Sequence, residues 1–173
     1  MKKTKLAQLL KNAGVKKIKG DDRLLISGIS FDSRKTRPGE LFFCIKGEFF
    51  DGHNFAEDAV KKGAIAVIAE KKLNLPHNLP PFTFILVKDT RKALATVSAE
   101  FYQHPENRLK IIGITGTNGK TTISFMVHDI LEAAGKKTAI IGTLYLKIGR
   151  ETEKLSHTTP EAPDLYRFFA RMV

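Results

Sequence analysis

The sequence predicts an α/β protein in two parts, and three observations lead to that fold class. Helical and strand-like patterns alternate through residues 1–105, which is enough chain for a complete small α/β domain. A glycine-rich turn within Lys110–Thr122 then joins a β-branched run to an amphipathic segment. Another apolar run, Thr138–Gly142, follows that segment, so strand, crossover helix and strand are expected to form one right-handed, parallel βαβ unit. We therefore expect a small N-terminal α/β domain followed by the first part of a parallel-sheet P-loop domain.

The N-terminal part is expected to contain both helices and strands. Apolar stripes predict helices at Lys3–Ala13, Phe55–Lys62 and Thr90–Gln103. Alternating or continuous apolar runs predict strands at Leu25–Phe31, Leu41–Ile45, Ala64–Ala69 and Phe82–Val87. Gly14 and Gly63 are placed to end the first two helices, and Asp89 is placed to cap the third. His104–Asn107 interrupts the pattern, which predicts domains at residues 1–105 and 109–173.

Lys110–Thr122 has the layout of a phosphate-binding loop. Ile111, Ile112 and Ile114 predict a buried strand, a glycine-rich turn follows, and Thr121–Ala134 is expected to be a helix. The general motif has a glycine six positions before its lysine, where this chain has Ile114. The alternative is a strand-to-helix turn that binds nothing. Packing alone does not explain Gly-Lys-Thr-Thr directly after an apolar strand, so we interpret the stretch as an ATP site.

The chemistry of this loop follows from its residue types. Gly116 and Gly119 lack Cβ, so backbone N–H groups can approach phosphate oxygens, and the helix N-terminus adds a positive dipole end. Lys120 would neutralise the β- and γ-phosphates and is the catalytic candidate, while the Thr121 hydroxyl would be a ligand for Mg²⁺. The expected ATP-binding residues are Gly116, Thr117, Asn118, Gly119, Lys120, Thr121 and Thr122.

Composition narrows the classes of partner. The net charge is +11, which raises nucleic acid as a partner. The lysines are scattered at separate element ends, and the aromatic–basic interleaving that stacks bases is absent. We expect a solvated basic surface that attracts an anionic, phosphate-bearing substrate, with no nucleic-acid partner.

Cysteine content and hydropathy indicate the compartment. The single cysteine, Cys44, excludes an intramolecular disulfide and a four-thiolate zinc site, and its strand-like surroundings predict a buried thiol. No apolar run is long enough to cross a membrane, and no apolar signal core follows the basic start of the chain. We expect a cytoplasmic protein without membrane insertion.

The last part of the chain suggests a longer protein. Leu144–Leu155 is expected to be a hairpin around Gly149-Arg150, and Asp164–Val173 a helix with an apolar stripe. Two parallel strands and a helix or two cannot cover both faces of a sheet. We expect the chain to be the front portion of a longer protein; the alternative is a minimal domain that dimerises over this stripe.

Several motifs, in order, resemble the Mur ligase family, whose members join amino acids to carboxylates with ATP. They are Asp32-Ser33-Arg34, Pro38-Gly39-Glu40-Leu41-Phe42-Phe43, Asp51-Gly52-His53-Asn54-Phe55, the loop Gly116–Thr122, and His157-Thr158-Thr159-Pro160-Glu161. The resemblance implies an N-terminal UDP-sugar-binding domain and the first part of a central ATP-binding P-loop domain. Thr-Thr-Pro-Glu is similar to the stretch in members that add the third residue of the peptide.

The resemblance also implies substrate-binding residues. Phe31 and Ser33 would contact the UDP-sugar part of the substrate, and Glu48, Phe49 and Phe50 would line the uridine pocket. In the same way, Thr158 and Thr159 would hold the sugar-peptide near the γ-phosphate. From the residues alone, Asp32-Ser33 is equally a strand-end turn, Arg34 a structural ion pair, and His53 a hydrogen-bonding loop residue.

The function that the resemblance implies is amide formation in peptidoglycan precursor synthesis. The substrates would be UDP-N-acetylmuramoyl-L-alanyl-D-glutamate, ATP with Mg²⁺, and a diamino acid, either meso-diaminopimelate or L-lysine. Family residues for further metal ligands and for the amino-acid pocket are not within this sequence, so we expect no turnover by this chain alone. Alternatives are the D-Ala-D-Ala-adding Mur ligase, a non-catalytic UDP-sugar and ATP-binding fragment, and a P-loop kinase or GTPase.

Overall fold

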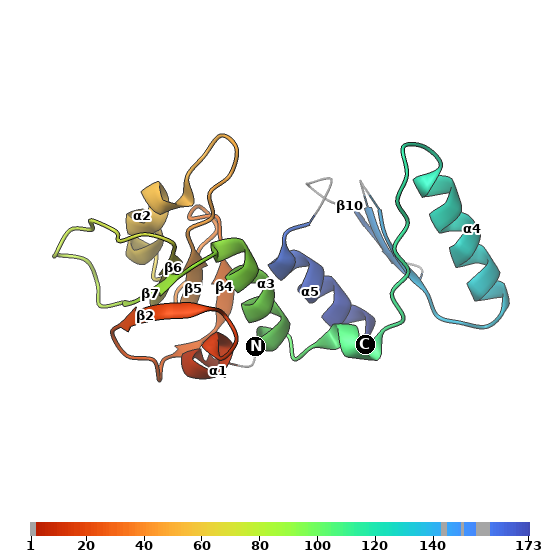
Figure 1. Cartoon of the computed structure of the whole chain (residues 1–173). Helices are drawn as coiled ribbons and strands as arrows, with labels where there is room; N and C mark the ends of the chain where they lie inside the picture. Colours follow the sequence, from red (N-terminus) through yellow and green to blue (C-terminus); the bar gives the residue numbers. More distant parts are fainter. Residues whose placement is uncertain (1–2, 143–144, 150, 155–159) are drawn as a thin grey trace. The chain divides into compact units, whose positions relative to one another are not determined.

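The computed structural model describes residues 3–142, 145–149, 151–154 and 160–173 (Figure 1). The chain divides into two compact units, residues 1–104 and 105–173, and each is described by itself. Among the described residues, no helix has the length and apolar composition that a membrane crossing needs.

The first unit is built on a five-stranded sheet in the order β2-β7-β6-β5-β4. Its strands are β2 (Val15–Lys19), β4 (Gly28–Ser30), β5 (Glu40–Phe43), β6 (Ala66–Ala69) and β7 (Thr83–Val87). β4, β5, β6 and β7 run parallel, and β2 pairs with β7 antiparallel at one edge. A separate antiparallel pair joins β1 (Thr4–Lys5) to β3 (Leu25–Ile26). The carboxyl ends of the four parallel strands therefore lie at one edge of the sheet.

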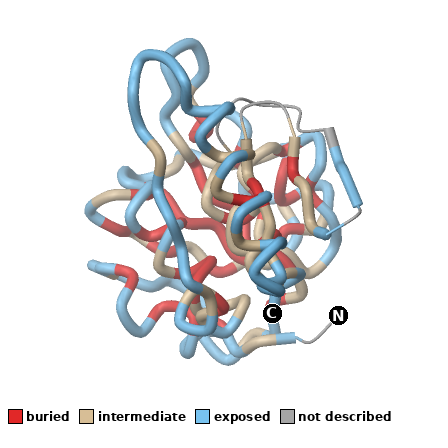
Figure 2. Tube along the Cα trace, turned by 90° about the vertical axis from the view of Figure 1, so that its right-hand side faces the viewer, coloured by how far each residue is buried: buried red, intermediate tan, exposed pale blue. Residues whose placement is uncertain are grey.

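Helices cover this sheet. They are α1 (Leu6–Leu10), the 3₁₀ turn η1 (Gly52–Phe55), α2 (Ala56–Lys61) and α3 (Thr90–Phe101). Phe42, Cys44 and Val67 are buried in one cluster with Ala59 and Val60 of α2. Side chains alternate along a strand, so the buried Leu41, Phe43 and Ile68 face the opposite side, and α1 packs against α3. Figure 2 colours each described residue by its burial, with buried positions in red and exposed positions in pale blue.

Most predicted elements of the first unit are confirmed, but two differ from the prediction. The predicted strand Leu25–Phe31 is divided into β3 and β4, which belong to different sheets, and Thr4–Lys5 of the predicted helix Lys3–Ala13 forms β1. Asp89 caps α3 as predicted, because its side chain accepts a hydrogen bond from the Lys92 backbone N–H at 2.9 Å. Cys44 is fully buried, and desolvation raises the pKa of its thiol to about 12. The sequence patterns missed β2, since three of its five residues are lysines and most of it is exposed. Lysine-rich, exposed strands are typical of sheet edges, and β2 is such an edge.

The second unit combines helices with a three-stranded sheet in the order β10-β9-β8. Its elements are η2 (Pro105–Arg108), α4 (Lys120–Ala133), β8 (Ala139–Ile141), β9 (Tyr145–Ile148), β10 (Glu151–Lys154) and α5 (Ala162–Met172). The predicted hairpin is confirmed for its described residues, with Glu151 opposite Ile148 and Gly149 at φ +56°. Ile140 and Leu146 of the sheet and Phe168 of α5 are buried.

Two predictions for the second unit are wrong. The run Ile111, Ile112 and Ile114 is not a strand, and Ile111 and Ile112 are 58% and 60% exposed. β8 pairs with β9 antiparallel, so the expected parallel βαβ unit does not form among the described residues. A strand needs a neighbour for its backbone N–H and C=O groups, and no described strand pairs with residues 111–115. Among the strands that the structure describes, the parallel pairs are those of the first unit.

Candidate functional site

The predicted ATP loop forms an exposed turn that leads directly into α4. Gly119 is the N-cap of α4. Its φ of +77° is a left-handed backbone conformation, which favours glycine. The helix then begins at Lys120, so the backbone N–H groups of its first turn have no acceptor within the helix. Every residue from Gly116 to Thr122 is exposed. The loop and helix N-terminus thus offer donors and a positive dipole end to an anion from solvent.

Lys120 is folded back over this turn. Its ammonium donates to the carbonyl oxygen of Gly116, and to that of Thr117 at 3.2 Å. The side chain therefore reaches across the loop, where a phosphate bound by the backbone would meet it. Thr121 and Thr122 are exposed on the first turn of α4. The exposed Thr121 hydroxyl is the kind of hard oxygen donor that Mg²⁺ prefers. Among the described residues, no group of three His, Cys, Asp or Glu side chains could hold a metal ion.

Phe31 and Ser33 follow β4 at the carboxyl edge of the first unit's sheet. Ser33 is buried and Phe31 half-buried. Asp32 lies between them in the sequence. Its carboxylate accepts two hydrogen bonds from the Arg34 guanidinium, from Nε at 2.9 Å and from Nη2 at 2.8 Å. The Arg34 side chain is the largest influence on the Asp32 carboxyl and lowers its pKa. Arg34 therefore forms an ion pair with its neighbour Asp32, and Asp32-Ser33 begins a turn after β4.

The loop that contains Glu48, Phe49 and Phe50 follows β5 at the same edge. Phe49 and Phe50 are 83% and 73% exposed. The loop is closed by a β-bridge between Lys46 and Asp51, and the Gly47 N–H donates to the Phe50 carbonyl at 2.8 Å. Because β4 and β5 are parallel neighbours, this loop and Phe31-Ser33 lie at the ends of adjacent strands. Ligands of open α/β sheets commonly bind at such carboxyl ends.

The predicted residues are divided between the two units, each of which is described by itself. Gly116–Thr122 belongs to the second unit, whereas Phe31, Ser33 and the β5 loop belong to the first. Thr158 and Thr159 lie outside the described residues. Two separate groups of predicted residues are therefore described, one for nucleotide phosphates and one at the edge of the first sheet.

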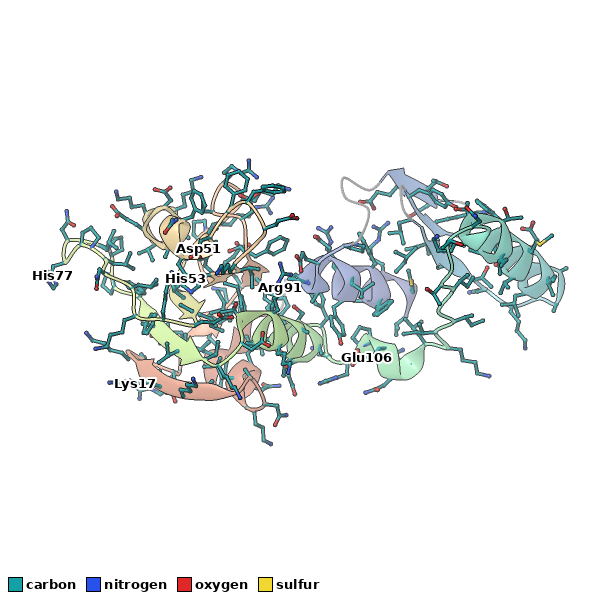
Figure 3. All side chains as sticks on the ribbon, turned by 45° about the horizontal axis from the view of Figure 1, so that its top comes forward. Lys17, Asp51, His53, His77, Arg91 and Glu106 are labelled. Atoms are coloured by element: carbon teal, nitrogen blue, oxygen red, sulfur yellow. The ribbon has the colours of Figure 1, made fainter. Side chains whose placement is uncertain are left out.

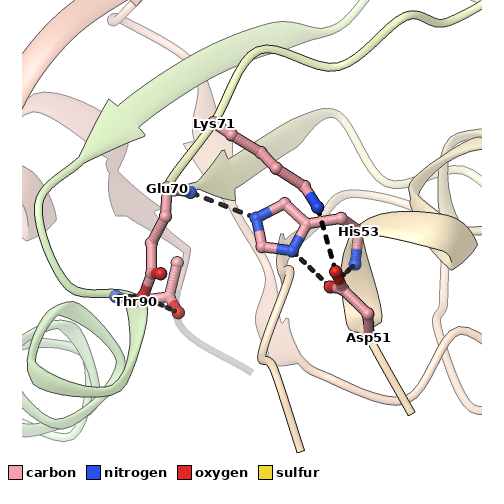
Figure 4. Close-up of polar contacts among 5 residues, drawn as sticks. All are labelled: Asp51, His53, Glu70, Lys71 and Thr90. Carbon is pink, nitrogen blue, oxygen red and sulfur yellow. Dashed lines mark hydrogen bonds and ion pairs between the residues drawn. The ribbon is translucent and has the colours of Figure 1, made fainter.

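A polar network that the sequence analysis did not assemble lies beside the β5 loop (Figure 4). It contains Asp51, His53, Glu70, Lys71 and Thr90. Asp51 accepts from the His53 ring at 2.5 Å and from Lys71 at 3.0 Å. Glu70 accepts from the backbone N–H and the hydroxyl of Thr90, both at 2.8 Å. The Asp-x-His spacing was the available sequence signal for the pair Asp51 and His53, but the other partner of the ring, Glu70, comes from the end of β6.

The carboxyl edge also carries an open cleft of about 630 Å³. It is lined by Asn12, Ala13, Gly14, Lys46, Glu70, Lys88, Asp89, Thr90, Arg91, Lys92 and Thr96. Four of these residues are cationic and two are acidic. The Glu70 carboxylate is hydrogen-bonded to Thr90, and the Asp89 carboxylate caps α3. The cleft therefore has a positive balance, which favours an anionic ligand.

Two family models match the chain. The model for the Mur ligase family, catalytic domain, matches residues 25–102, and the model for the Mur ligase middle domain matches residues 114–173. The first range contains the edge of the parallel sheet and its polar network. The second contains the turn Gly116–Thr122 and α4.

Individual relatives and solved structures that are similar to this chain are also described as ligases. The UDP-N-acetylmuramoyl-L-alanyl-D-glutamate–2,6-diaminopimelate ligase of Syntrophomonas wolfei is 45% identical over 166 residues, covering 96% of this chain and 33% of that protein. A solved structure of a ligase with the same description has a TM-score of 0.74 at 25% identity, covering 98% of this chain and 33% of that one. The MurF ligase of Thermotoga maritima in complex with ADP has a TM-score of 0.52 at 26% identity, covering 82% and 28%. The chain therefore spans about a third of the length of the curated relatives it matches.

Proposed function

Because this chain belongs to the Mur ligase family, we propose that it carries the UDP-sugar-binding and ATP-phosphate-binding parts of a ligase of peptidoglycan precursor synthesis. The parent reaction adds a diamino acid to UDP-N-acetylmuramoyl-L-alanyl-D-glutamate and forms ADP and phosphate. The name of the Syntrophomonas wolfei relative favours meso-diaminopimelate over L-lysine as the amine. The observation that carries the proposal is the exposed turn Gly116–Thr122 at the start of α4, within the matched middle domain.

The chemistry requires activation of a carboxylate. The D-glutamate side-chain carboxylate attacks the γ-phosphorus of ATP, the bond to the bridging oxygen of ADP breaks, and an acyl phosphate forms. The amine then attacks the acyl carbon, phosphate leaves, and the nitrogen loses a proton to give the amide. Charge on the transferring phosphoryl group must be neutralised throughout.

This chain's residues supply part of that neutralisation. The backbone N–H groups from Gly116 to Thr122 bind phosphate oxygens, and Lys120 exchanges its contacts with the loop carbonyls for contacts with the β- and γ-phosphates. Mg²⁺ held with the help of Thr121 would draw further negative charge from the phosphates. Lys120 is therefore the catalytic residue proposed in this chain.

The UDP-sugar end is assigned to the carboxyl edge of the first unit. Phe31 and Ser33 would contact it, Glu48, Phe49 and Phe50 would line the uridine pocket, and Thr158 and Thr159 would hold the sugar-peptide. The positive balance of the nearby cleft supports a diphosphate-bearing ligand. We place the protein in the cytoplasm, because its single cysteine, the free and buried Cys44, fits a reducing compartment.

A D-Ala-D-Ala-adding Mur ligase is the second candidate, because the ADP-bound MurF structure is similar to this chain. The diaminopimelate ligase structure covers more of the chain, 98% against 82%, at a higher TM-score, 0.74 against 0.52. We therefore rank the diaminopimelate ligase first.

Titration calorimetry on the 173-residue chain tests the proposal. We expect Mg-ATP and UDP-N-acetylmuramoyl-L-alanyl-D-glutamate each to bind, and Lys120→Ala to weaken ATP at least about tenfold, the equivalent of about 1.4 kcal/mol. Lys137→Ala, at an exposed position after α4, is the matched control and should bind ATP as the wild type does. A coupled ADP-release assay with either diamino acid should show no turnover. Failure to bind either ligand would refute the proposal, and turnover would contradict the expectation that the residues of this chain are insufficient for catalysis.

A further inference from the structure

His53 connects segments that follow different strands of the parallel sheet. Its imidazole is buried, with the residue only 7% exposed. The Glu70 backbone N–H, at the end of β6, donates to its Nε2 at 3.2 Å. Since Nε2 accepts, the ring proton of a neutral imidazole is on Nδ1, and Nδ1 donates to the Asp51 carboxylate at 2.5 Å. The ring thus joins Asp51, after β5, to the end of β6.

Both partners of His53 are themselves held in place. Asp51 also accepts from the His53 backbone N–H and from Lys71, each at 3.0 Å. Glu70 continues the network to the first residue of α3, because its side chain accepts from the Thr90 backbone N–H and hydroxyl. Figure 4 shows His53 between Asp51 and the Glu70 backbone, with Glu70 leading on to Thr90. The ring is therefore hydrogen-bonded to the Glu70 backbone at the end of β6 through one nitrogen and to the loop residue Asp51 through the other.

Backbone contacts, and not burial, hold the loop that Asp51 closes. Phe49 and Phe50 are largely exposed, so burial does not hold them. The loop backbone is held by the bridge between Lys46 and Asp51 and by the Gly47 N–H bond to Phe50. Next to it, the Gly52 N–H donates to the Ile45 carbonyl at 2.9 Å, and a Cβ on Gly52 would lie 2.6 Å from the Ile45 backbone nitrogen. The position of Asp51 therefore sets where the loop returns to the sheet.

We propose that His53 is a positioning residue for the UDP-sugar substrate: by tying Asp51 to the Glu70 backbone it fixes the loop Gly47–Asp51 in its binding conformation. This inference rests on the proposed function, which assigns Glu48, Phe49 and Phe50 to the uridine pocket. Holding the loop in advance reduces the ordering cost on binding, so its loss weakens the affinity for the uridine ligand. ATP binding, at Gly116–Thr122 of the second unit, does not depend on it.

The test compares substitutions at His53. His53→Leu removes both hydrogen bonds of the ring, whereas His53→Gln keeps one group that donates and one that accepts. His53→Asn keeps them on a shorter side chain. His77→Leu is the matched control, because His77 is exposed on the connection between β6 and β7, away from Asp51 and His53 (Figure 3). Circular dichroism and thermal unfolding establish that each variant is folded.

Two readouts are measured on the 173-residue chain. Amide hydrogen exchange at Gly47 and Gly52 should be at least about tenfold faster in His53→Leu than in the wild type, since local opening sets that rate. Calorimetry should show at least about tenfold weaker binding of UDP-N-acetylmuramoyl-L-alanyl-D-glutamate with unchanged Mg-ATP affinity. His53→Gln should recover much of both, His53→Asn less, and His77→Leu should match the wild type.

Unchanged exchange at Gly47 and Gly52 would overturn the inference. Faster exchange with unchanged affinity for the UDP-sugar would also overturn it, because His53 would then be purely structural. If the wild type binds no UDP-sugar, the proposed function has failed and exchange alone decides whether His53 orders the loop. Should His53→Leu not fold, the difference between the Gln and Asn variants provides the same comparison.

Discussion

At the scale of single residues, Asp51 concentrates the polar interactions of the first unit. Burial raises the pKa of its carboxyl, but hydrogen bonds from the His53 backbone, Lys71 and the His53 ring outweigh burial and hold that pKa well below its usual value. A carboxyl with a depressed pKa in the folded state stabilises the protein above the pKa of the unfolded state, about 3.9. That contribution is lost as the pH falls through and below this value.

Replacing Asp51 by Asn should therefore change the pH dependence of stability. We expect the wild type to be more stable than Asp51→Asn at pH 7, and the difference to shrink steadily as the pH falls from about 5 to about 2. Urea unfolding followed by circular dichroism across this range measures the free energy of unfolding of both proteins. A difference that stays constant with pH would contradict the assigned hydrogen bonds of Asp51.

Roles can be proposed from the sequence for residues that act within a short stretch, and these roles stay predictions. Gly116, Gly119 and Lys120 carry their chemistry in local spacing, and the structure places them together at the start of α4. His53 is different, because its partner Glu70 is 17 residues away. Only the order of the parallel strands brings those two residues together, and no local pattern specifies that order.

At the scale of elements, predictions succeeded where an apolar pattern coincides with a covered surface. β5, β6 and β7 are such cases, since their central positions are buried. The prediction failed for Ile111, Ile112 and Ile114, because a β-branched run forms a strand only when a neighbour accepts and donates its backbone hydrogen bonds. The apolar pattern also missed β2, because this exposed edge strand is rich in lysine.

Helix ends of the first unit provide a matched pair of glycine substitutions. Gly63 follows α2 at φ +100°, and a Cβ there would lie 2.9 Å from the Pro38 Cα. Gly14 follows α1 at φ +65°, and a Cβ added there would have no described atom within 4 Å. We expect Gly14→Ala to cost about 1 kcal/mol from the left-handed conformation alone, and Gly63→Ala about 3 kcal/mol because the backbone clash adds to it.

Urea unfolding of the two variants measures this difference, since both glycines lie in the same unit. The control is Gly14→Ala, which isolates the conformational cost. Equal losses of unfolding free energy in the two variants would mean that a clash between the Cβ at position 63 and Pro38 adds nothing to the cost.

At the scale of the whole molecule, the chain joins two units with separate proposed ligands. The first presents Ser33 and the β5 loop at the carboxyl edge of a parallel sheet, and the second presents Gly116–Thr122 at a helix N-terminus. Each has its own match to a Mur ligase domain model. We therefore propose that one unit binds the UDP-sugar and the other binds the ATP phosphates.

The most direct test is a nuclear magnetic resonance titration of the ¹⁵N-labelled chain with each ligand separately. We predict that UDP-N-acetylmuramoyl-L-alanyl-D-glutamate shifts the amide signals of Ser33 and of Gly47–Gly52. Mg-ATP should instead shift those of Gly116–Thr122. Saturating amounts of both ligands that leave these two groups of amides unshifted would contradict the account.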